Sequence, residues 1–219
     1  MTEHDRVAPI VIPPVGLQGL LGIPRSPSGV VVFAHGSGSG RLSPRNNMVA
    51  SALRQGGLGT LLFDLLTEPE AADRRKVFDI PLLAERLLEA TSWLRAMKEA
   101  ASLPIGYFGA STGAAAALAA AAEAASNIAA VVSRGGRPDL ADAALPKVQS
   151  PTLLIIGGAD EIVLDLNRQA LARLLCEKQL VVVPGAGHLF EEPGTLEQVV
   201  NHARRWFLDH FTPVDNQPR

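Results

Sequence analysis

The sequence has 219 residues, 47% hydrophobic and 19% charged, which supplies enough apolar side chains for one large core. Twenty Lys and Arg against 22 Asp and Glu give a formal net charge of -2, so the composition predicts neither a nucleic-acid partner nor an anionic membrane as partner. The N-terminus lacks the apolar region of a secretory signal, and no segment approaches the roughly 20 apolar residues of a membrane span. A single cysteine excludes an intramolecular disulfide. We therefore expect a cytoplasmic protein.

Short apolar runs alternate with helical patterns along the chain. An antiparallel opening pair is predicted over Val7–Val15 and Leu17–Ile23, where Pro and Gly interrupt the apolar run. Further strands are predicted at Val30–Ala34, Thr60–Asp64, Ile105–Ala110, Ile128–Ser133, Thr152–Ile156 and Leu180–Val183. Helices are predicted at Pro44–Gln55, with Ser43 as its cap, and at Pro81–Ala101, Thr112–Ala125, Val163–Leu175 and Thr195–Phe211.

Repeated strand–loop–helix units predict the α/β class, with one domain over residues 1–219 and short loose termini at about 1–6 and 212–219. The sheet is expected to be mostly parallel, with helices on both faces. The strand-to-helix loops then meet at the carboxyl edge of the sheet, where open α/β folds place their chemistry. The segment Arg134–Ser150 is too short to hold a cap domain.

The segment Gly109-Ala110-Ser111-Thr112-Gly113 matches G-x-S-x-G directly after a predicted strand and at the start of a predicted helix. Such a turn places a serine nucleophile on strained backbone, so the residues two before and two after it must be small. Both are glycine here. The pattern alone is weakly specific, so the identity of the nucleophile depends on whether the chain also supplies a base and an acid.

A serine hydroxyl needs a base in contact with it. Among five histidines, His188 follows a predicted strand through the loop PGAG and precedes the last helix, so we take it as the base. Asp160, at the end of the preceding strand, is the predicted carboxylate that orients His188. Glu161 is the neighbouring alternative, and a helix N-cap is the structural alternative for Asp160. The order Ser111, Asp160, His188 is that of α/β-hydrolases.

An oxyanion hole needs two N–H groups aimed at the developing charge. We expect one from Thr112, which follows the nucleophile, and the other from Ser37, in the loop HGSGSG. His35 is expected to brace this loop. A phosphate cradle is the alternative for the loop, but neither G-x-x-x-x-G-K-S/T nor G-x-G-x-x-G is present.

The segments HGSGSG, FGASTGAAAAL, LLIIGGADEIV and PGAGHLFEEPG resemble the α/β-hydrolase superfamily, and in particular its dienelactone hydrolase-like branch. The resemblance covers essentially the whole chain, most securely Gly29 to Phe211. It implies an eight-stranded sheet whose second strand is antiparallel, and hydrolysis of esters or lactones through an acyl-enzyme, with no cofactor and no metal. Dienelactone hydrolases proper use a cysteine nucleophile, whereas this chain has Ser111, which favours a general carboxylesterase acting on small esters.

Several alternatives remain open at this point. A thioesterase or acyltransferase would use the same triad, and a non-catalytic ligand-binding protein would retain only the fold. Cys176 is interpreted as a structural thiol in a helical stretch rather than a nucleophile. Four arginines near the catalytic edge are candidates for holding an acidic substrate group, with solvated surface arginines or loop-bracing ion pairs as the alternative: Arg41, Arg45, Arg134 and Arg137. The expected partner is a small-molecule ester, and a homo-oligomer is compatible with the sequence.

Overall fold

A computed structural model describes residues 7–123 and 128–211; the expected loose termini and the predicted end of the helix at Ala125 lie outside these residues. Within the described part, eight strands form one sheet in the order β1-β2-β4-β3-β5-β6-β7-β8. β2 runs antiparallel to both of its neighbours, and the pairs from β4 to β8 are parallel. The α/β class and the antiparallel second strand are therefore confirmed.

The strands are short and mostly buried. Their bounds are β1 Val7–Ile12, β2 Leu17–Gly22, β3 Val30–Ala34, β4 Gly59–Phe63, β5 Ile105–Ala110, β6 Ala130–Arg134, β7 Thr152–Gly157 and β8 Lys178–Val183. The longer helices are α1 Pro44–Gln55, α4 Ile80–Ala96, α5 Thr112–Glu123, α6 Glu161–Arg173 and α7 Thr195–His210. As predicted, Pro44 opens α1 and the Ser43 hydroxyl accepts the Asn46 N–H as its cap.

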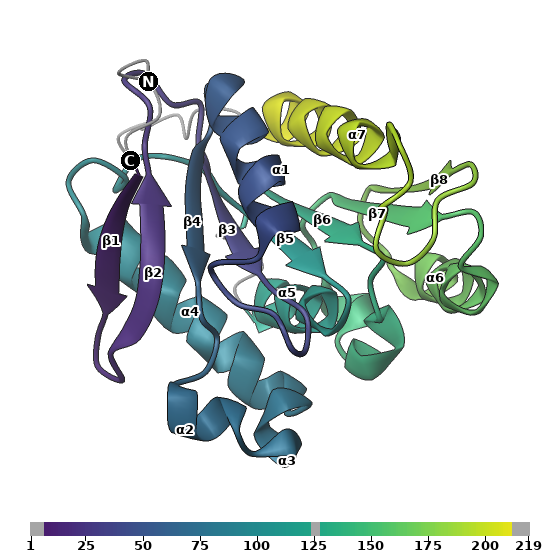
Figure 1. Ribbon diagram of the computed structural model, residues 1–219, viewed down its shortest axis with the longest axis horizontal. Helices are drawn as coiled ribbons and strands as arrows, with labels where there is room; N and C mark the ends of the chain where they lie inside the picture. Colours follow the sequence, from purple (N-terminus) through teal and green to yellow (C-terminus); the bar gives the residue numbers. More distant parts are fainter. Residues whose placement is uncertain (1–6, 124–127, 212–219) are drawn as a thin grey trace.

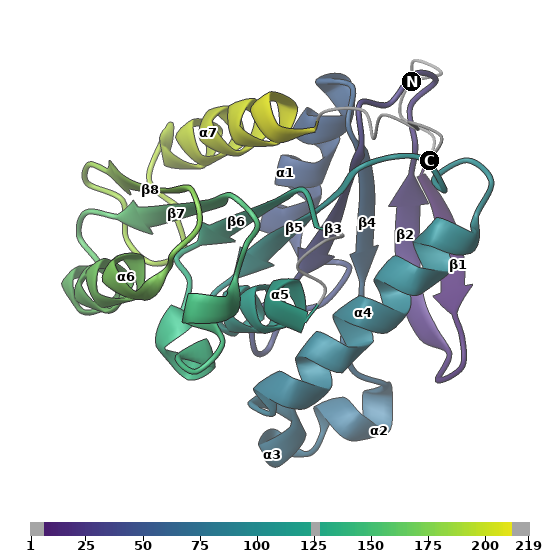
Figure 2. The same ribbon diagram turned by 180° about the vertical axis from the view of Figure 1, so that it is seen from behind.

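The helices lie on both faces of the sheet, with α1 and α7 on one face and α4, α5 and α6 on the other (Figures 1 and 2). The position of β3 in the sheet explains why its sequence is a continuous apolar run. Val30 and Val32 pack into the core under α4 and α5, and Val31 and Phe33 pack into the core under α1 and α7. Since both faces of β3 are covered, alternation of apolar and polar residues is absent from its sequence.

Several short helices were not predicted from the sequence. Between β4 and α4 the chain forms α2 Glu68–Ala71 and α3 Arg74–Val77, and between β6 and β7 it forms two 3-10 helices, Pro138–Ala141 and Leu145–Lys147. Four-residue helices are too short to display a helical hydrophobic period. The described segment between β6 and β7 thus holds two short turns of helix where a cap domain would be inserted.

Two predicted helices end earlier than expected. α4 ends at Ala96 because Met97 adopts an extended conformation, and residues 97–103 form turns that lead to Pro104 and β5. α6 ends at Arg173 instead of Leu175, so Cys176 follows the helix rather than lying in it. Among the described residues, no helix is long and apolar enough to cross a membrane.

Candidate active site

Ser111 lies on the turn between β5 and α5 with φ 52°, a left-handed value that side chains rarely adopt. The flanking glycines make this turn possible. A Cβ at Gly113 would lie 2.1 Å from the Ala34 carbonyl oxygen, and a Cβ at Gly109 would lie 2.4 Å from the Ala114 Cα. Any larger residue at either position would displace backbone, so the turn can form only with both glycines in place.

The structure brings Ser111, His188 and Asp160 together from three separate loops. His188 Nε2 lies 3.3 Å from Ser111 Oγ, and His188 Nδ1 lies 2.7 Å from Asp160 Oδ2. The bond to the carboxylate assigns the ring proton to Nδ1, which leaves the Nε2 lone pair facing the Ser111 hydroxyl. The imidazole is thus oriented to take a proton from Ser111.

The alternatives for the acid and the nucleophile do not fit this arrangement. Asp160 precedes α6, but its side chain makes no capping hydrogen bond and contacts His188 instead. Glu161 is exposed as the first residue of α6. Cys176 Sγ lies 3.7 Å from the hydroxyl of Thr152, which begins β7, whereas Asp160 follows the other end of that strand. The thiol is therefore at the opposite edge of the sheet from Ser111.

Ser37 and Thr112, the two predicted donors of the oxyanion hole, contact each other. The Ser37 amide donates to Thr112 Oγ1 at 2.9 Å. A Cβ at Gly36 would lie 3.0 Å from Ser111 Cβ, so the backbone before Ser37 passes directly beside the serine. Thr112 opens α5, and its N–H belongs to the first helical turn, which has no intrahelical acceptor. Both backbone donors therefore lie beside Ser111.

His35 braces the loop that carries Ser37, as the sequence suggested. The Leu65 N–H donates to His35 Nε2 at 3.0 Å, and Nδ1 donates to the Gly36 carbonyl at 3.0 Å. The imidazole thus ties this loop to the segment after β4. Burial lowers the pKa of His35 below its ordinary value of 6.5, against the raising effects of the Gly36 hydrogen bond and of Asp64.

The lowered pKa of His35 predicts an acid-sensitive fold. Because the unfolded chain binds a proton near pH 6.5 and the folded chain resists it, the stabilising effect of neutral His35 is present above pH 6.5 and is lost as the pH falls toward the folded pKa. The loss from this residue is at most about 1.4 kcal/mol per pH unit. Urea unfolding at pH 8 and pH 5.5 should show a smaller acid-induced loss in His35→Gln than in the unmodified protein. His202→Gln, at an exposed position of α7, is the control and should leave the acid-induced loss unchanged. An equal loss in His35→Gln and in the unmodified protein would contradict the assignment.

The arginines near the edge are mostly engaged by carboxylates. Arg41 pairs with Asp64 through both its backbone N–H and its guanidinium. Arg45 pairs with Glu191 at 2.6 Å, and Arg137 pairs with Asp139 at 2.7 Å. These three arginines therefore make ion pairs, and the Arg41–Asp64 pair is partly buried and braces the loop after β3.

Arg134 is different because its side chain is buried and its guanidinium lies 5.9 Å from the centre of the Phe190 ring. Burial, together with the nearby Arg45, lowers the pKa of Arg134 to about 10. Its backbone carbonyl accepts the Ser111 N–H at 3.2 Å. Arg134 thus holds the nucleophile through its main chain, while its side chain packs under the loop that carries His188.

Gly135 is a residue of the site that sequence reasoning missed. It has φ 52°, and a Cβ there would lie 3.1 Å from the His188 carbonyl oxygen and 3.6 Å from two atoms of its ring. The glycine therefore lets the His188 loop lie directly against the end of β6. The only sequence signal for this close approach is the pair of glycines in SRGG directly after a strand, and no site role was predicted from it.

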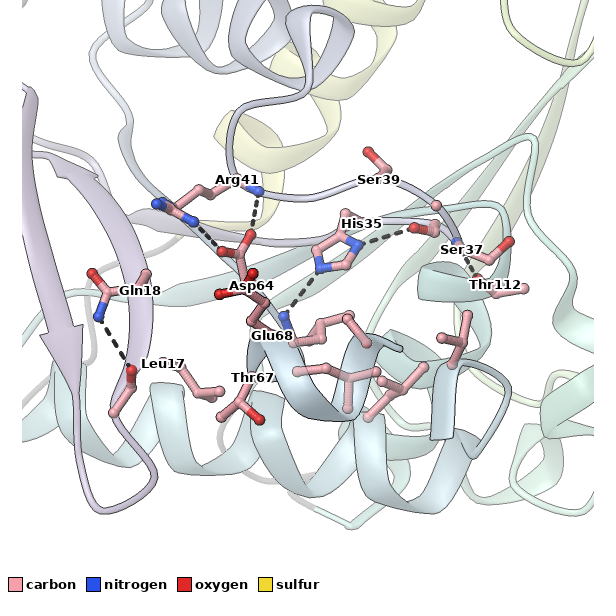
Figure 3. Close-up of a pocket in the computed structure, with 18 residues that line it drawn as sticks. Leu17, Gln18, His35, Ser37, Ser39, Arg41, Asp64, Thr67, Glu68 and Thr112 are labelled. Atoms are coloured by element: carbon pink, nitrogen blue, oxygen red, sulfur yellow. Dashed lines mark hydrogen bonds and ion pairs between the residues drawn. The ribbon is translucent and has the colours of Figure 1, made fainter. Parts of the chain in front are cut away.

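A cavity of about 550 Å³ adjoins the proposed donors (Figure 3). Ser37 and Thr112 lie at one side of it, and Gln18, Arg41 and Asp64 lie at the other. Its apolar lining comes from β2, from the segment after β4 and from the helices that follow, as Leu17, Leu65, Leu66, Ala71, Val77 and Leu83. The unpredicted helices α2 and α3 therefore form part of the wall of this cavity.

Comparison with known proteins places the chain in a family. Residues 17–209 match the dienelactone hydrolase family. The chain belongs to that family. It is also 51% identical to a dienelactone hydrolase from Anabaena variabilis, whose crystal structure superposes with a TM-score of 0.92 over 95% of this chain and 99% of that one. The fold and the family assignment agree with the resemblance in the sequence.

Two further comparisons differ in how much of the sequence they share. Est1E from Butyrivibrio proteoclasticus shares the fold alone: it is 16% identical, with a TM-score of 0.79 over 92% of this chain and 98% of that one. Two Mycobacterium tuberculosis proteins carrying the name "Putative phosphoribosyl transferase" are each 58% identical over 208 residues, which is 95% of this chain and 47% of theirs. The chain spans about half the length of these relatives, so their name describes a longer protein.

Proposed function

We propose that this member of the dienelactone hydrolase family is a serine carboxylesterase that cleaves small esters or lactones through an acyl-enzyme on Ser111. The observation that carries the proposal is the continuous series of contacts from Ser111 Oγ to His188 to Asp160, on a turn whose backbone only flanking glycines permit. No cofactor takes part in the proposed steps.

In the proposed acylation, His188 Nε2 takes the proton of the Ser111 hydroxyl as the oxygen attacks the ester carbonyl. Asp160 keeps the proton on Nδ1 and stabilises the imidazolium that forms. The carbonyl oxygen becomes negatively charged and is bound by the amides of Ser37 and Thr112. To bind there, the oxygen must displace the Thr112 hydroxyl, which accepts the Ser37 N–H when no substrate is bound.

In the following steps, His188 gives its proton to the leaving alkoxide, and the alcohol departs. A water molecule then takes the place of the alcohol, and His188 removes its proton as the water attacks the acyl-enzyme. Collapse of the second tetrahedral intermediate releases the carboxylic acid and returns the proton to Ser111. The same base therefore serves both halves of the reaction, with no net consumption of a protein group.

Small ester substrates are favoured by the size of the cavity and by the relatives. The cavity of about 550 Å³ matches a small organic molecule. The relative from Anabaena variabilis is named a dienelactone hydrolase, which supports ester or lactone chemistry. The name of the Mycobacterium tuberculosis relatives points to phosphoribosyl transfer, but this chain covers only 47% of their length, and its match is to a hydrolase family.

The test is a comparison of substrates at equal acyl chain length. We expect the protein to hydrolyse p-nitrophenyl butyrate, with water outcompeting added alcohols and amines as acceptor. Faster turnover of a butyryl thioester than of the oxygen ester would favour the thioesterase alternative, and transfer to an added acceptor would favour the acyltransferase alternative. No turnover of any of these substrates would support a non-catalytic ligand-binding role.

A further inference from the structure

The position of the cavity relative to His188 determines whether the cavity receives the acyl part or the alcohol part of an ester. The leaving oxygen takes its proton from His188 Nε2, so the alcohol part lies on the His188 side of the tetrahedral carbon. The lining of the cavity includes neither Ser111 nor His188, but it includes Ser37 and Thr112, the two neighbours of the nucleophile. With the carbonyl oxygen on the amides of these two residues, the substituent that continues into the cavity is the acyl chain.

The cavity is apolar along one wall and carries charge at its far side. Leu65, Val77 and Leu83 supply apolar contacts for a chain of methylene groups. Across from the oxyanion donors, Arg41 and Glu68 bring opposite charges into the same space (Figure 3). An acyl chain long enough to cross the cavity therefore ends among charged groups rather than in an apolar pocket.

The positive charge of Arg41 does not neutralise the negative charge of Glu68. Arg41 is paired with Asp64 through its guanidinium, so this pair is neutral as a unit. His35 lines the cavity as a neutral imidazole, because burial lowers its pKa. Among the described residues, the Glu68 carboxylate makes no ion pair and no hydrogen bond. Glu68 is exposed to solvent where it borders the cavity, and it adds a negative charge there that no ion pair within the described residues offsets.

Glu68 is held in place by the helix that carries it. The neighbouring Glu70 accepts the Thr67 N–H at 3.0 Å and lies 3.4 Å from the guanidinium of Arg86 on α4. These contacts lower the pKa of Glu70 to about 2, chiefly through the Thr67 backbone bond. The backbone of α2 is thereby fixed against α4, and the exposed Glu68 side chain extends from this helix at the border of the cavity.

We propose that Glu68 makes the enzyme selective for esters whose acyl chain ends in a cation or hydroxyl donor, and that it disfavours acyl chains ending in a carboxylate. The inference rests on the proposed function. An ammonium group at the far side of the cavity would gain an attractive partner in Glu68, whereas a carboxylate would meet a like charge, with Arg41 already engaged by Asp64.

Four p-nitrophenyl esters of equal reach test the proposal at pH 7.5: the 6-aminohexanoate, the 6-hydroxyhexanoate, the hexanoate and the monoester of adipic acid. We expect kcat/KM to fall in that order, with the ammonium ester severalfold above the carboxylate ester at low salt, because an exposed carboxylate interacts only weakly with a nearby charge. In Glu68→Gln, the ratio of ammonium to carboxylate ester should fall severalfold. Glu197→Gln on α7 removes the same charge far from this cavity and should leave the ratio unchanged.

Each outcome separates the inference from the proposed function. If the hexanoate ester is not hydrolysed at all, the proposed function fails. If it is hydrolysed but the carboxylate ester is preferred, and Arg41→Gln removes that preference, then Arg41 and not Glu68 sets selectivity and the inference is wrong. An equal change of the ratio in Glu68→Gln and Glu197→Gln would also overturn it, because net charge alone would then explain the effect.

Discussion

Replacement of Ser111 by alanine is expected to lower kcat for p-nitrophenyl butyrate by a factor of about 10⁴ or more. The substitution removes the oxygen that lies 3.3 Å from His188 Nε2 and leaves the base with nothing to activate except water. Alanine fits the space of serine, so the turn with φ 52° should be retained. Steady-state kinetics on folded protein, verified by circular dichroism, measures the effect.

A serine on α1 provides the matched control. Ser51→Ala removes a hydroxyl from the middle of a helix that does not border the cavity, and should leave kcat within about twofold, since surface substitutions are usually near neutral. Activity of Ser111→Ala close to that of the unmodified protein would mean that the nucleophile lies elsewhere. Residual turnover that a second purification removes would indicate a contaminating esterase.

The second large effect is expected at Asp160. In Asp160→Asn, the side-chain amide can donate to His188 Nδ1, which moves the ring proton to Nε2 and leaves no lone pair for the Ser111 hydroxyl. We expect kcat to fall by about 10³ to 10⁴ with little change in stability, since the shape of the side chain is kept. The pH dependence of kcat should be recorded from pH 6 to 9 on both proteins.

Glu161 supplies the control for Asp160, because it is the next residue and carries the same charge. Glu161→Gln should retain most of the activity, since its side chain is exposed at the start of α6. If Glu161→Gln loses as much activity as Asp160→Asn, the carboxylate that orients His188 is misassigned. If neither loses activity, His188 works without an orienting acid.

The sequence predicted the elements whose pattern is local. The run VVVFA predicted β3 at its observed bounds, and Ser43 with Pro44 predicted the start of α1, because caps and buried strands leave a signal in adjacent residues. The order of Ser111, Asp160 and His188 predicted their convergence, because parallel strands bring their carboxyl ends to one edge. Local pattern and topology together were enough for the triad.

The features that were missed depend on contacts between distant residues. The bond from the Ser37 amide to Thr112 joins residues 75 apart, and the Arg45–Glu191 pair joins residues 146 apart. No periodicity encodes such pairs. Helix α2 was missed because four residues cannot show a helical period, although Thr67 and Glu70 form a capping box that signals its start. The charge at the far side of the cavity, set by Glu68, was therefore visible only in the structure.

Mass spectrometry after treatment with a small fluorophosphonate tests the central claim most directly, because the reagent reacts much faster with an activated serine than with ordinary side chains. The account predicts one adduct per chain, on the peptide that contains Ser111, and no adduct in Ser111→Ala. An adduct on another residue, or an unlabelled protein that still hydrolyses esters, would show that Ser111 is not the nucleophile.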